Sequence, residues 1–236
     1  MSGHSKWATT KHQKAATDAR KSNLFTKIAN TISVAARSGG GPTMNFQLRL
    51  AIDKARTANM PKDKIERAIK RGTGELGGAQ IEEVTYEAYG LGGTAILVET
   101  LTDNKNRTSG EIKSIFNKLG GKLAESGSVA YLFSRKGVIR AVGSVSKDEA
   151  EMAIIDSGAE DYATDNEAFL IYTKPEDLFK VKTALEVANM TVLSAELSWE
   201  PNTTIELNEE QSGRAVKLLE TLDELDDITN VSSNLG

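Results

Sequence analysis

The 236-residue chain contains 39% hydrophobic and 26% charged residues, an ordinary globular composition, and no run near the roughly 18 apolar residues of a membrane helix. It has no cysteine, which excludes disulfides, zinc ribbons, iron–sulfur ligation and thiol chemistry. Residues 1–7 lack the apolar core of a secretory signal, so we expect a cytoplasmic protein, long enough for two or three domains.

The formal net charge of −4 hides two oppositely charged parts. Residues 1–72 contain 15 Lys and Arg against 4 Asp and Glu, whereas residues 73–236 contain 14 against 29. Such an excess of positive charge in a short segment is self-repulsive unless a polyanion binds it. The asymmetry therefore predicts that nucleic acid binds the N-terminal segment.

The N-terminal segment has helical patterning, which is weakest at its start. Residues 8–22 have only alanines as apolar residues, and alanine burial cannot offset ordering costs of about 1–2 kcal/mol per residue. This composition predicts either a stretch that is disordered until it binds, or a helix on which Lys11, Lys14 and Lys21 form one basic stripe.

Three amphipathic helices are expected after this stretch. Apolar residues recur at helical spacing over Leu24–Ala36, Leu48–Ala55 and Ile65–Ile69, which predicts a small shared core. The third helix is expected to have Pro61 at its first position and to end at Gly72, where a glycine-rich linker begins.

The candidate nucleic-acid-binding residues are lysines and arginines of this segment together with Trp7 and His12. Lysine and arginine bind phosphate largely without regard to base sequence, Trp7 could stack on a base, and Phe25 is expected in the core. Any single lysine could be a solvated surface residue, whereas the whole set needs a polyanion. No zinc finger, leucine heptad or RNP-type aromatic pair is present to read bases. The candidates are Lys6, Trp7, Lys11, His12, Lys14, Arg20, Lys21, Lys27, Arg49, Lys64, Arg67, Lys70 and Arg71.

Downstream of the linker the pattern is mixed. Thr85–Tyr89 and Thr94–Glu99 predict a hairpin around the turn Gly90–Gly93. These glycines do not suit a nucleotide-binding loop, because such a loop opens a helix and this one opens a strand. A capping box at Thr108–Glu111 predicts the start of a helix, and Val129–Phe133 predicts the next strand.

Residues 137–201 read as strand, helix, strand, strand, helix, strand, which is the ferredoxin-like βαββαβ order. Its helices are expected to open at the capping box Ser146–Glu149 and at Pro175. After this unit, Thr204–Leu207 and Ile228–Val231 predict strands on either side of a helix capped by Asn208. The four strands of the unit are expected at Val138–Val142, Asp161–Thr164, Ala168–Thr173 and Val192–Trp199.

The predicted fold class is therefore α+β. We expect an N-terminal basic helical domain followed by two α/β-sandwich domains. One of these two is the ferredoxin-like unit, and it is inserted in the chain of the other one. The expected boundaries are 1–78 for the basic helical domain, 79–135 plus 202–236 for the discontinuous middle domain, and 136–201 for the inserted domain.

The sequence offers no catalytic or metal site, so we expect no enzyme activity, metal or cofactor. His4 and His12 are the only histidines, and the acidic cluster at 223–227 has no His or Cys beside it and is expected to be solvated. A polar loop before a helix start could hold phosphate through Lys105 and Arg107, or it could be a plain turn and cap.

Several motifs resemble the YebC/PmpR family over essentially the whole chain. They include Gly3-His4-Ser5-Lys6-Trp7, Asn59-Met60-Pro61, Glu66–Gly72, Tyr86–Gly90, Asp103–Thr108 and Gly127–Phe133. The resemblance implies a cytoplasmic protein of three domains, of a kind described as a probable transcriptional regulator that binds DNA. Bacterial members and mitochondrial relatives are also linked to translation on the ribosome.

Three functions remain as hypotheses. The first is a DNA-binding transcriptional regulator, which the family's usual label favours. The second is a ribosome-associated translation factor that binds ribosomal RNA through the same basic helices, which the lack of a base-reading motif favours. The third is an adaptor whose acidic domains bind a protein partner.

Overall fold

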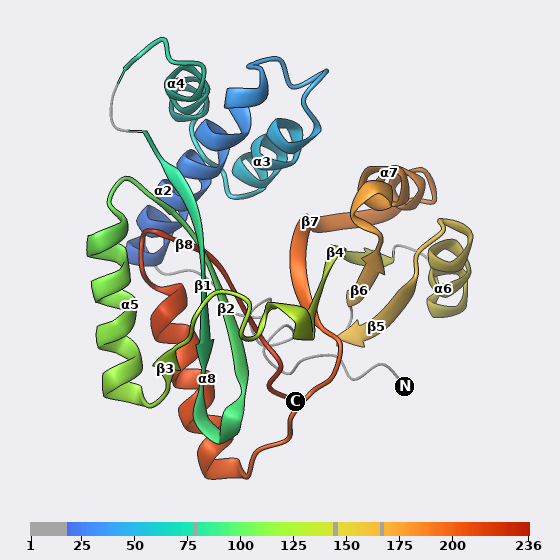
Figure 1. The fold of residues 1–236 in the computed structure, drawn as a ribbon. Helices are drawn as coiled ribbons and strands as arrows, with labels where there is room; N and C mark the ends of the chain where they lie inside the picture. The colour runs from blue at the N-terminus through green and yellow to red at the C-terminus, as the bar shows by residue number, and fades with distance from the viewer. Residues whose placement is uncertain (1–17, 78–79, 144–145, 166–167) are drawn as a thin grey trace. The chain divides into compact units, whose positions relative to one another are not determined.

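The computed structural model describes residues 18–77, 80–143, 146–165 and 168–236. Over these residues it contains a group of helices near the N-terminus and two four-stranded antiparallel sheets (Figure 1). The predicted α+β class is therefore confirmed. The chain divides into two compact units, of which Ser134–Glu200 is the second and the remaining residues are the first.

The first unit begins with helices that pack around one small core, as the apolar spacing predicts. Ile32 and Leu48 are completely buried in this core. Asn45 caps α3 by accepting the Leu48 N–H, and its amide donates to the carbonyls of Ala35 and Gly39. One cap therefore also ties α3 to the end of α2. The elements are α2 (Asp18–Ala35), the 3₁₀ turn η1 (Ala36–Ser38), α3 (Phe46–Thr57) and α4 (Lys62–Gly72).

One detail of these helices differs from the prediction. Pro61 is the N-cap of α4 instead of its first residue, because its backbone is still extended, with ψ of 140°. Of the stretch 8–22, residues 8–17 lie outside the described residues, while residues 18–22 are helical. Leu24 and Phe25 pack against the core from the next turn, so α2 is anchored beyond its weakly apolar start.

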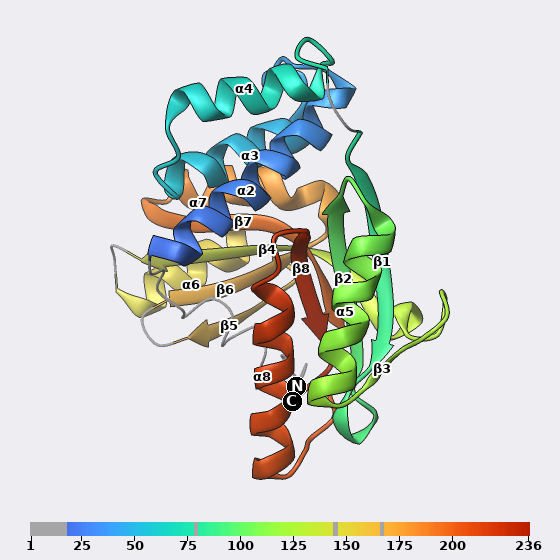
Figure 2. The ribbon, with the colours of Figure 1, turned by 90° about the vertical axis from the view of Figure 1, so that its left-hand side faces the viewer.

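The first unit continues as a sheet with strand order β3-β1-β2-β8. Helices α5 and α8 lie side by side on one face of it (Figure 2). Ile96 and Val98 of the sheet, Phe116 of α5 and Leu218 of α8 share one buried cluster. The elements are β1 (Glu82–Tyr89), η2 (Leu91–Gly93), β2 (Ala95–Thr102), α5 (Lys105–Leu119), β3 (Lys122–Leu123), η3 (Ala130–Leu132), α8 (Glu209–Asp223) and β8 (Ile228–Ser233).

Helix α5 begins earlier than predicted, so the capping box at Thr108 is wrong. The cap is Asn104, whose side-chain oxygen accepts the Arg107 N–H at 3.1 Å. Thr108 lies inside the helix, and its hydroxyl contacts the Asn104 carbonyl at 3.1 Å and the Asp227 carboxylate at 2.6 Å. Asparagine is as good a cap as threonine, and here it comes first in the chain.

The strand predicted at Val129–Phe133 exists only at its last residue. Glu87 of β1 is 6% exposed and accepts the N–H groups of Gly127 (2.6 Å), Val129 (2.6 Å) and Ala130 (2.9 Å). These bonds curl the backbone into η3 before β4 begins. Burial raises the pKa of Glu87, but the backbone donors outweigh burial and leave the pKa below its ordinary value.

The second unit is a sheet with strand order β5-β6-β4-β7, the arrangement of the predicted ferredoxin-like βαββαβ unit. The capping box at Ser146 and Glu149 is present with both of its hydrogen bonds. All six residues of β6 are buried, and Leu178 of α7 packs closely over Gly137 of β4. The elements are β4 (Phe133–Gly143), α6 (Lys147–Asp156), β5 (Asp161–Asp165), β6 (Ala168–Thr173), η4 (Pro175–Asp177), α7 (Leu178–Val187) and β7 (Met190–Pro201).

The strand predicted at Thr204–Leu207 is reduced to a single parallel bridge between Ile205 and Leu235. The Ile205 N–H donates to the Asn234 carbonyl, and the Ile205 carbonyl accepts the Gly236 N–H, but the pairing does not extend into a strand.

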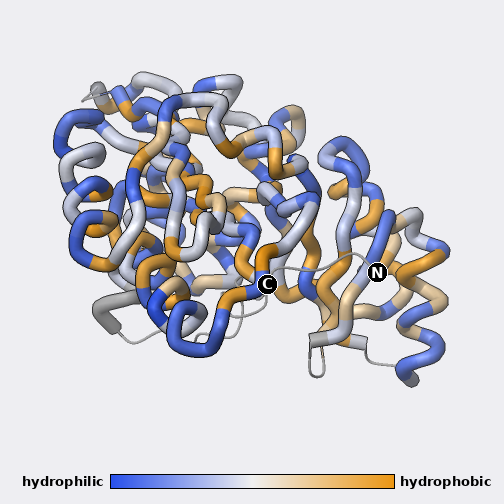
Figure 3. Tube along the Cα trace, turned by 60° about the horizontal axis from the view of Figure 1, so that its bottom comes forward, coloured by the Kyte–Doolittle hydropathy of each residue, from blue (hydrophilic) through white to orange (hydrophobic). Residues whose placement is uncertain are grey.

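In Figure 3 hydrophobic and hydrophilic stretches alternate along the traced chain, as expected for elements with one buried side and one exposed side.

Candidate nucleic-acid interface

Helices α2 and α4 lie so close together that no side chain fits between them at Gly72. A Cβ atom there would lie 2.1 Å from the Ser33 carbonyl oxygen and 2.7 Å from the Ala36 Cβ. The Ser33 hydroxyl lies 2.9 Å from the Ala29 carbonyl in its own helix and 2.9 Å from the Ala68 carbonyl of α4. The hydrogen bond from Ser33 to Ala68 and the close approach at Gly72 together fix the distance between α2 and α4.

A groove of about 460 Å³ lies between these helices. Its lining combines small, polar and apolar side chains. Three of the lining residues are cations and none is a carboxylate. The lining residues are Ser22, Phe25, Thr26, Ala29, Asn30, Ser33, Met60, Lys64, Arg67, Ala68, Arg71, Leu76 and Gly77.

The three cations of the groove are exposed, and they share one side of α4 because they are three and four residues apart. The Lys64 ammonium lies 5.4 Å from the centre of the Phe25 ring, and Arg71 donates to the Asn30 side-chain oxygen at 3.1 Å. Among the described residues, none of Lys64, Arg67 and Arg71 forms an ion pair with a carboxylate. Their positive charge is therefore available to an anion in the groove.

Two other candidate cations are engaged within the protein. The Lys27 side chain is 14% exposed, lies 3.8 Å from the Asp223 carboxylate of α8, and also donates to the Asp223 carbonyl. The Arg49 guanidinium donates to the carbonyls of Pro42 and Thr43 at 3.1 and 2.8 Å. Both side chains thus have structural partners.

The structure brings together only part of the predicted set. Lys70 is exposed on α4 but does not line the groove, and Arg20 and Lys21 belong to the first turn of α2. The candidates that lie outside the described residues are Lys6, Trp7, Lys11, His12 and Lys14.

Sequence reasoning missed the contribution of α2 to this groove. Ser22, Thr26 and Asn30 lie along its edge, together with Phe25, which also packs against the core. The spacing of four residues between the three polar side chains is the signal that could have shown a polar stripe facing α4.

Lys105 and Arg107, the candidate phosphate contacts, are paired with carboxylates. The Lys105 ammonium lies 2.6 Å from Glu82, and the Arg107 guanidinium lies 3.0 Å from Asp103 and 2.7 Å from Asp227. A phosphate at this helix start would have to compete with these carboxylates.

The acidic cluster at 223–227 is not simply solvated. The Asp227 side chain is 12% exposed and accepts hydrogen bonds from Arg107, Thr108 and Thr102. Burial raises the pKa of Asp227, but these donors and the charge of Arg107 leave it below its ordinary value. The expectation of solvation is therefore wrong for Asp227, which joins α5 to the turn before β8.

Two further features concern the described part of the chain only. Within it, no three His, Cys, Asp or Glu side chains are grouped so that they could hold a metal ion. Its helices also include none that is long and apolar enough to cross a membrane.

Residues 5–75 match the family described as the TACO1/YebC protein N-terminal domain, and residues 81–235 match the family described as the TACO1/YebC second and third domain. The chain therefore belongs to the TACO1/YebC family. The resemblance stated from its motifs is confirmed.

Relatives are similar over the full length. A "Probable transcriptional regulatory protein" of Treponema denticola is 52% identical over 100% of this chain and 96% of its own length. One of Thermoanaerobacter pseudethanolicus is 49% identical over 100% and 97%. The crystal structure of a conserved hypothetical protein from Aquifex aeolicus has a TM-score of 0.91 at 46% identity, covering 98% of this chain and 97% of that one.

Proposed function

We propose that this protein is a cytoplasmic, non-enzymatic regulator of gene expression that binds a nucleic-acid backbone in the α2/α4 groove. The observation that carries the proposal is the groove lining, which has Lys64, Arg67 and Arg71 but no carboxylate. A phosphodiester lying there would meet three cations from α4 and hydrogen-bond donors from Thr26 and Asn30 of α2.

Duplex DNA is the partner that we favour, because relatives of about 50% identity carry the name "Probable transcriptional regulatory protein". The division of charge supports contact at one end only. Residues 73–236 carry 29 Asp and Glu against 14 Lys and Arg, so phosphates are repelled from most of the remaining surface. We infer that residues 1–78 act as the binding domain, with 79–135 plus 202–236 and 136–201 as the two other domains.

Ribosomal RNA is a second candidate partner, in a protein that acts on translation. The groove offers cations and small polar side chains, and its described residues include no pair of exposed aromatic rings for stacking bases. Such a lining binds backbone without reading sequence, and an RNA backbone suits it as well as a DNA backbone.

Salt-dependent binding of the full-length chain tests the groove. We expect Arg67→Gln with Arg71→Gln to weaken binding to a duplex of any sequence and to reduce the slope of log affinity against log salt by about 0.9 for each phosphate that the variant no longer neutralises. Arg56→Gln with Lys62→Gln is the matched control, because it removes two exposed cations that do not line the groove. Equal weakening in both variants would show a general charge effect and contradict the groove assignment.

Crosslinking in cells, with sequencing of the bound DNA and RNA and co-sedimentation with ribosomes, separates the two partners. Discrete promoter peaks without ribosome association would support transcription and exclude the translation hypothesis. Crosslinks to ribosomal RNA without promoter peaks would do the reverse.

A further inference from the structure

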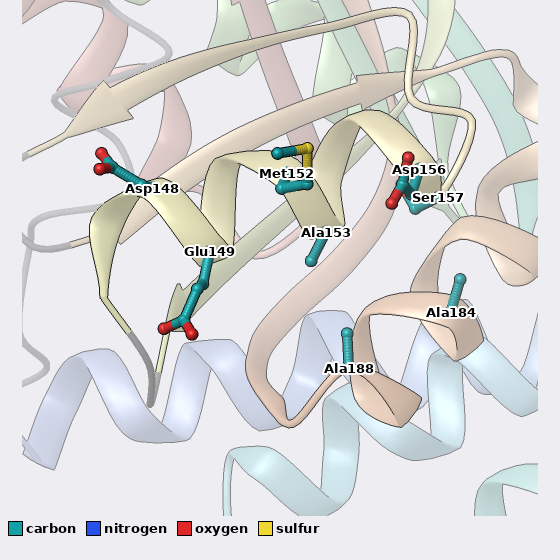
Figure 4. A pocket seen from close by; sticks show the side chains of 8 residues that line it. All are labelled: Asp148, Glu149, Met152, Ala153, Asp156, Ser157, Ala184 and Ala188. Carbon is teal, nitrogen blue, oxygen red and sulfur yellow. The ribbon is translucent and has the colours of Figure 1, made fainter.

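A second groove lies between helices α6 and α7 of the second unit. Along the sequence, these helices are far from Lys64, Arg67 and Arg71. The groove has a volume of about 560 Å³ (Figure 4). Helix α7 lines it with Ala184, and Ala188 follows at the end of that helix; in Figure 4 both methyl groups point toward α6. Because Ala153 faces them from α6, only small side chains meet where the helices approach, and the space between them stays open. The α6 side comprises Asp148, Glu149, Met152, Ala153, Asp156 and the adjoining Ser157.

The helices do not need this groove for their own packing. Ile154 of α6 and Val181 and Leu185 of α7 are completely buried, and none of them lines the groove. Large apolar residues nevertheless remain exposed, with 63% of Met152, 62% of Ile155 and 78% of Val187 accessible.

This exposure is concentrated on one pair of helices. Of seven large hydrophobic residues exposed in the described ranges, four belong to α6 and α7, the fourth being Phe179. Single exposed apolar residues are ordinary on protein surfaces, and of these four only Met152 lines the groove, where it gives a partner an apolar contact.

The charge of the groove selects the kind of partner. Asp148, Glu149 and Asp156 line it, and none of its lining residues is a cation. Of the lysines of α6 and α7, Lys147 pairs with Glu151 and Lys182 with Glu186. Lys180 is exposed one turn before Ala184 but is not a lining residue, so the three lining carboxylates outnumber it. A nucleic-acid backbone or an anionic lipid surface would be repelled by three carboxylates, whereas lysine and arginine would be attracted.

We propose that the α6/α7 groove binds a basic amphipathic helix of a partner protein. The apolar side of that helix lies over Met152 and the alanines, and its Lys and Arg side chains pair with the three carboxylates at the rim. Helix α6 has ten residues and is therefore about 15 Å long, enough to hold two to three turns of a bound helix.

A synthetic peptide tests this proposal on the full-length chain. The probe is a fluorescent peptide of about 18 residues made of Leu, Ala and Lys, with Lys confined to one helical face, and its binding is followed by fluorescence anisotropy. We expect Ala184→Phe, which fills the groove, to weaken binding at least about tenfold, and Asp156→Lys at least about fivefold. Thr183→Phe and Glu111→Lys are matched controls, because they make the same kinds of change at exposed positions outside the groove, and each should alter affinity less than about twofold.

Three results would overturn the proposal. The first is equal weakening by a groove variant and its control, and the second is equally tight binding of a peptide with Glu in place of Lys. The third is concentration-dependent self-association of the chain that Ala184→Phe abolishes, which would make a second copy the occupant. Asp156→Lys changes an exposed charge without altering packing, so it keeps the test valid if Ala184→Phe disturbs folding. Binding of duplex DNA should be unchanged in Ala184→Phe, which separates this test from that of the proposed function.

Discussion

Replacing Glu87 by glutamine should destabilise the protein strongly, although the two side chains have nearly the same size. The carboxylate accepts three backbone N–H groups at 2.6–2.9 Å in a site that is 6% exposed. A hydrogen bond to a charged group contributes about 1.5–3 kcal/mol, and the glutamine amide would turn an NH₂ group toward one of these donors. We expect the free energy of unfolding to fall by about 2–4 kcal/mol at pH 7, and the melting midpoint by about 5–15 °C.

The pH dependence of this difference tests the reasoning more sharply than its size. Because the pKa of Glu87 is lowered in the folded protein, its contribution is fully present above the unfolded-state pKa of about 4.3. That contribution is lost as the pH falls through the lower folded-state pKa, so the gap between wild type and Glu87→Gln should shrink from pH 7 to pH 3.

Urea denaturation at both pH values measures the gap, and hydrogen exchange of the Val129 and Ala130 amides measures the local loss. Glu125→Gln, an exposed change in the same loop, is the control and should be neutral. A gap that is the same at pH 3 and pH 7 would refute the role of the Glu87 carboxylate.

Three further predictions concern single substitutions. Gly72→Ala should lower the free energy of unfolding by about 1–3 kcal/mol, because the new Cβ atom would collide with α2. Gly110→Ala, in open space on α5, should instead raise it by about 0.5–1 kcal/mol. Chemical denaturation compares the two variants, and equal effects would contradict the tight helix contact. Asn104→Ala should lose about 1 kcal/mol with the cap of α5, and Asn106→Ala should not, as thermal melting can show; similar losses would mean that Asn104 is not the cap. Asp227→Asn should destabilise the protein at pH 7 and less so at pH 3. The folded-state pKa of Asp227 is lowered, so the stability that its carboxylate contributes disappears as the pH falls. If the difference in unfolding free energy between wild type and variant grew on acidification, this sign would be contradicted.

Most secondary structure could be predicted because local signals and tertiary contacts agree. The capping box at Ser146, the cap at Asn208 and the strand Ala168–Thr173 occur where the sequence places them. The failures occurred where a distant side chain decides the outcome. Glu87 bonds to the backbone about 40 residues away and replaces a strand by a turn, and no local pattern around Val129 records that contact.

Of the two walls of the α2/α4 groove, only the one formed by α4 could be predicted from the sequence. The spacing of Lys64, Arg67 and Arg71 places them on one side of a helix, and the structure puts them along one groove. The opposite wall depends on which face of α2 meets α4, which is a tertiary property. The neutralisation of Arg107 by Asp227 likewise joins residues 120 positions apart, so the sequence could indicate a phosphate contact without showing the carboxylate that competes for it.

The insertion of Ser134–Glu200 between two parts of the first unit bears on how the protein forms during synthesis. Strand β2 pairs with β8 across about 130 residues, and Ile96 and Val98 are covered by α8 and β8, which are synthesised after the second unit. The second unit has all four of its strands once residue 201 has been made, whereas the first must wait with an unfinished sheet and an exposed apolar face. The first unit thus begins its sheet before the second unit and completes it afterwards, and chaperone dependence should concentrate on the β1–β2 hairpin in that interval.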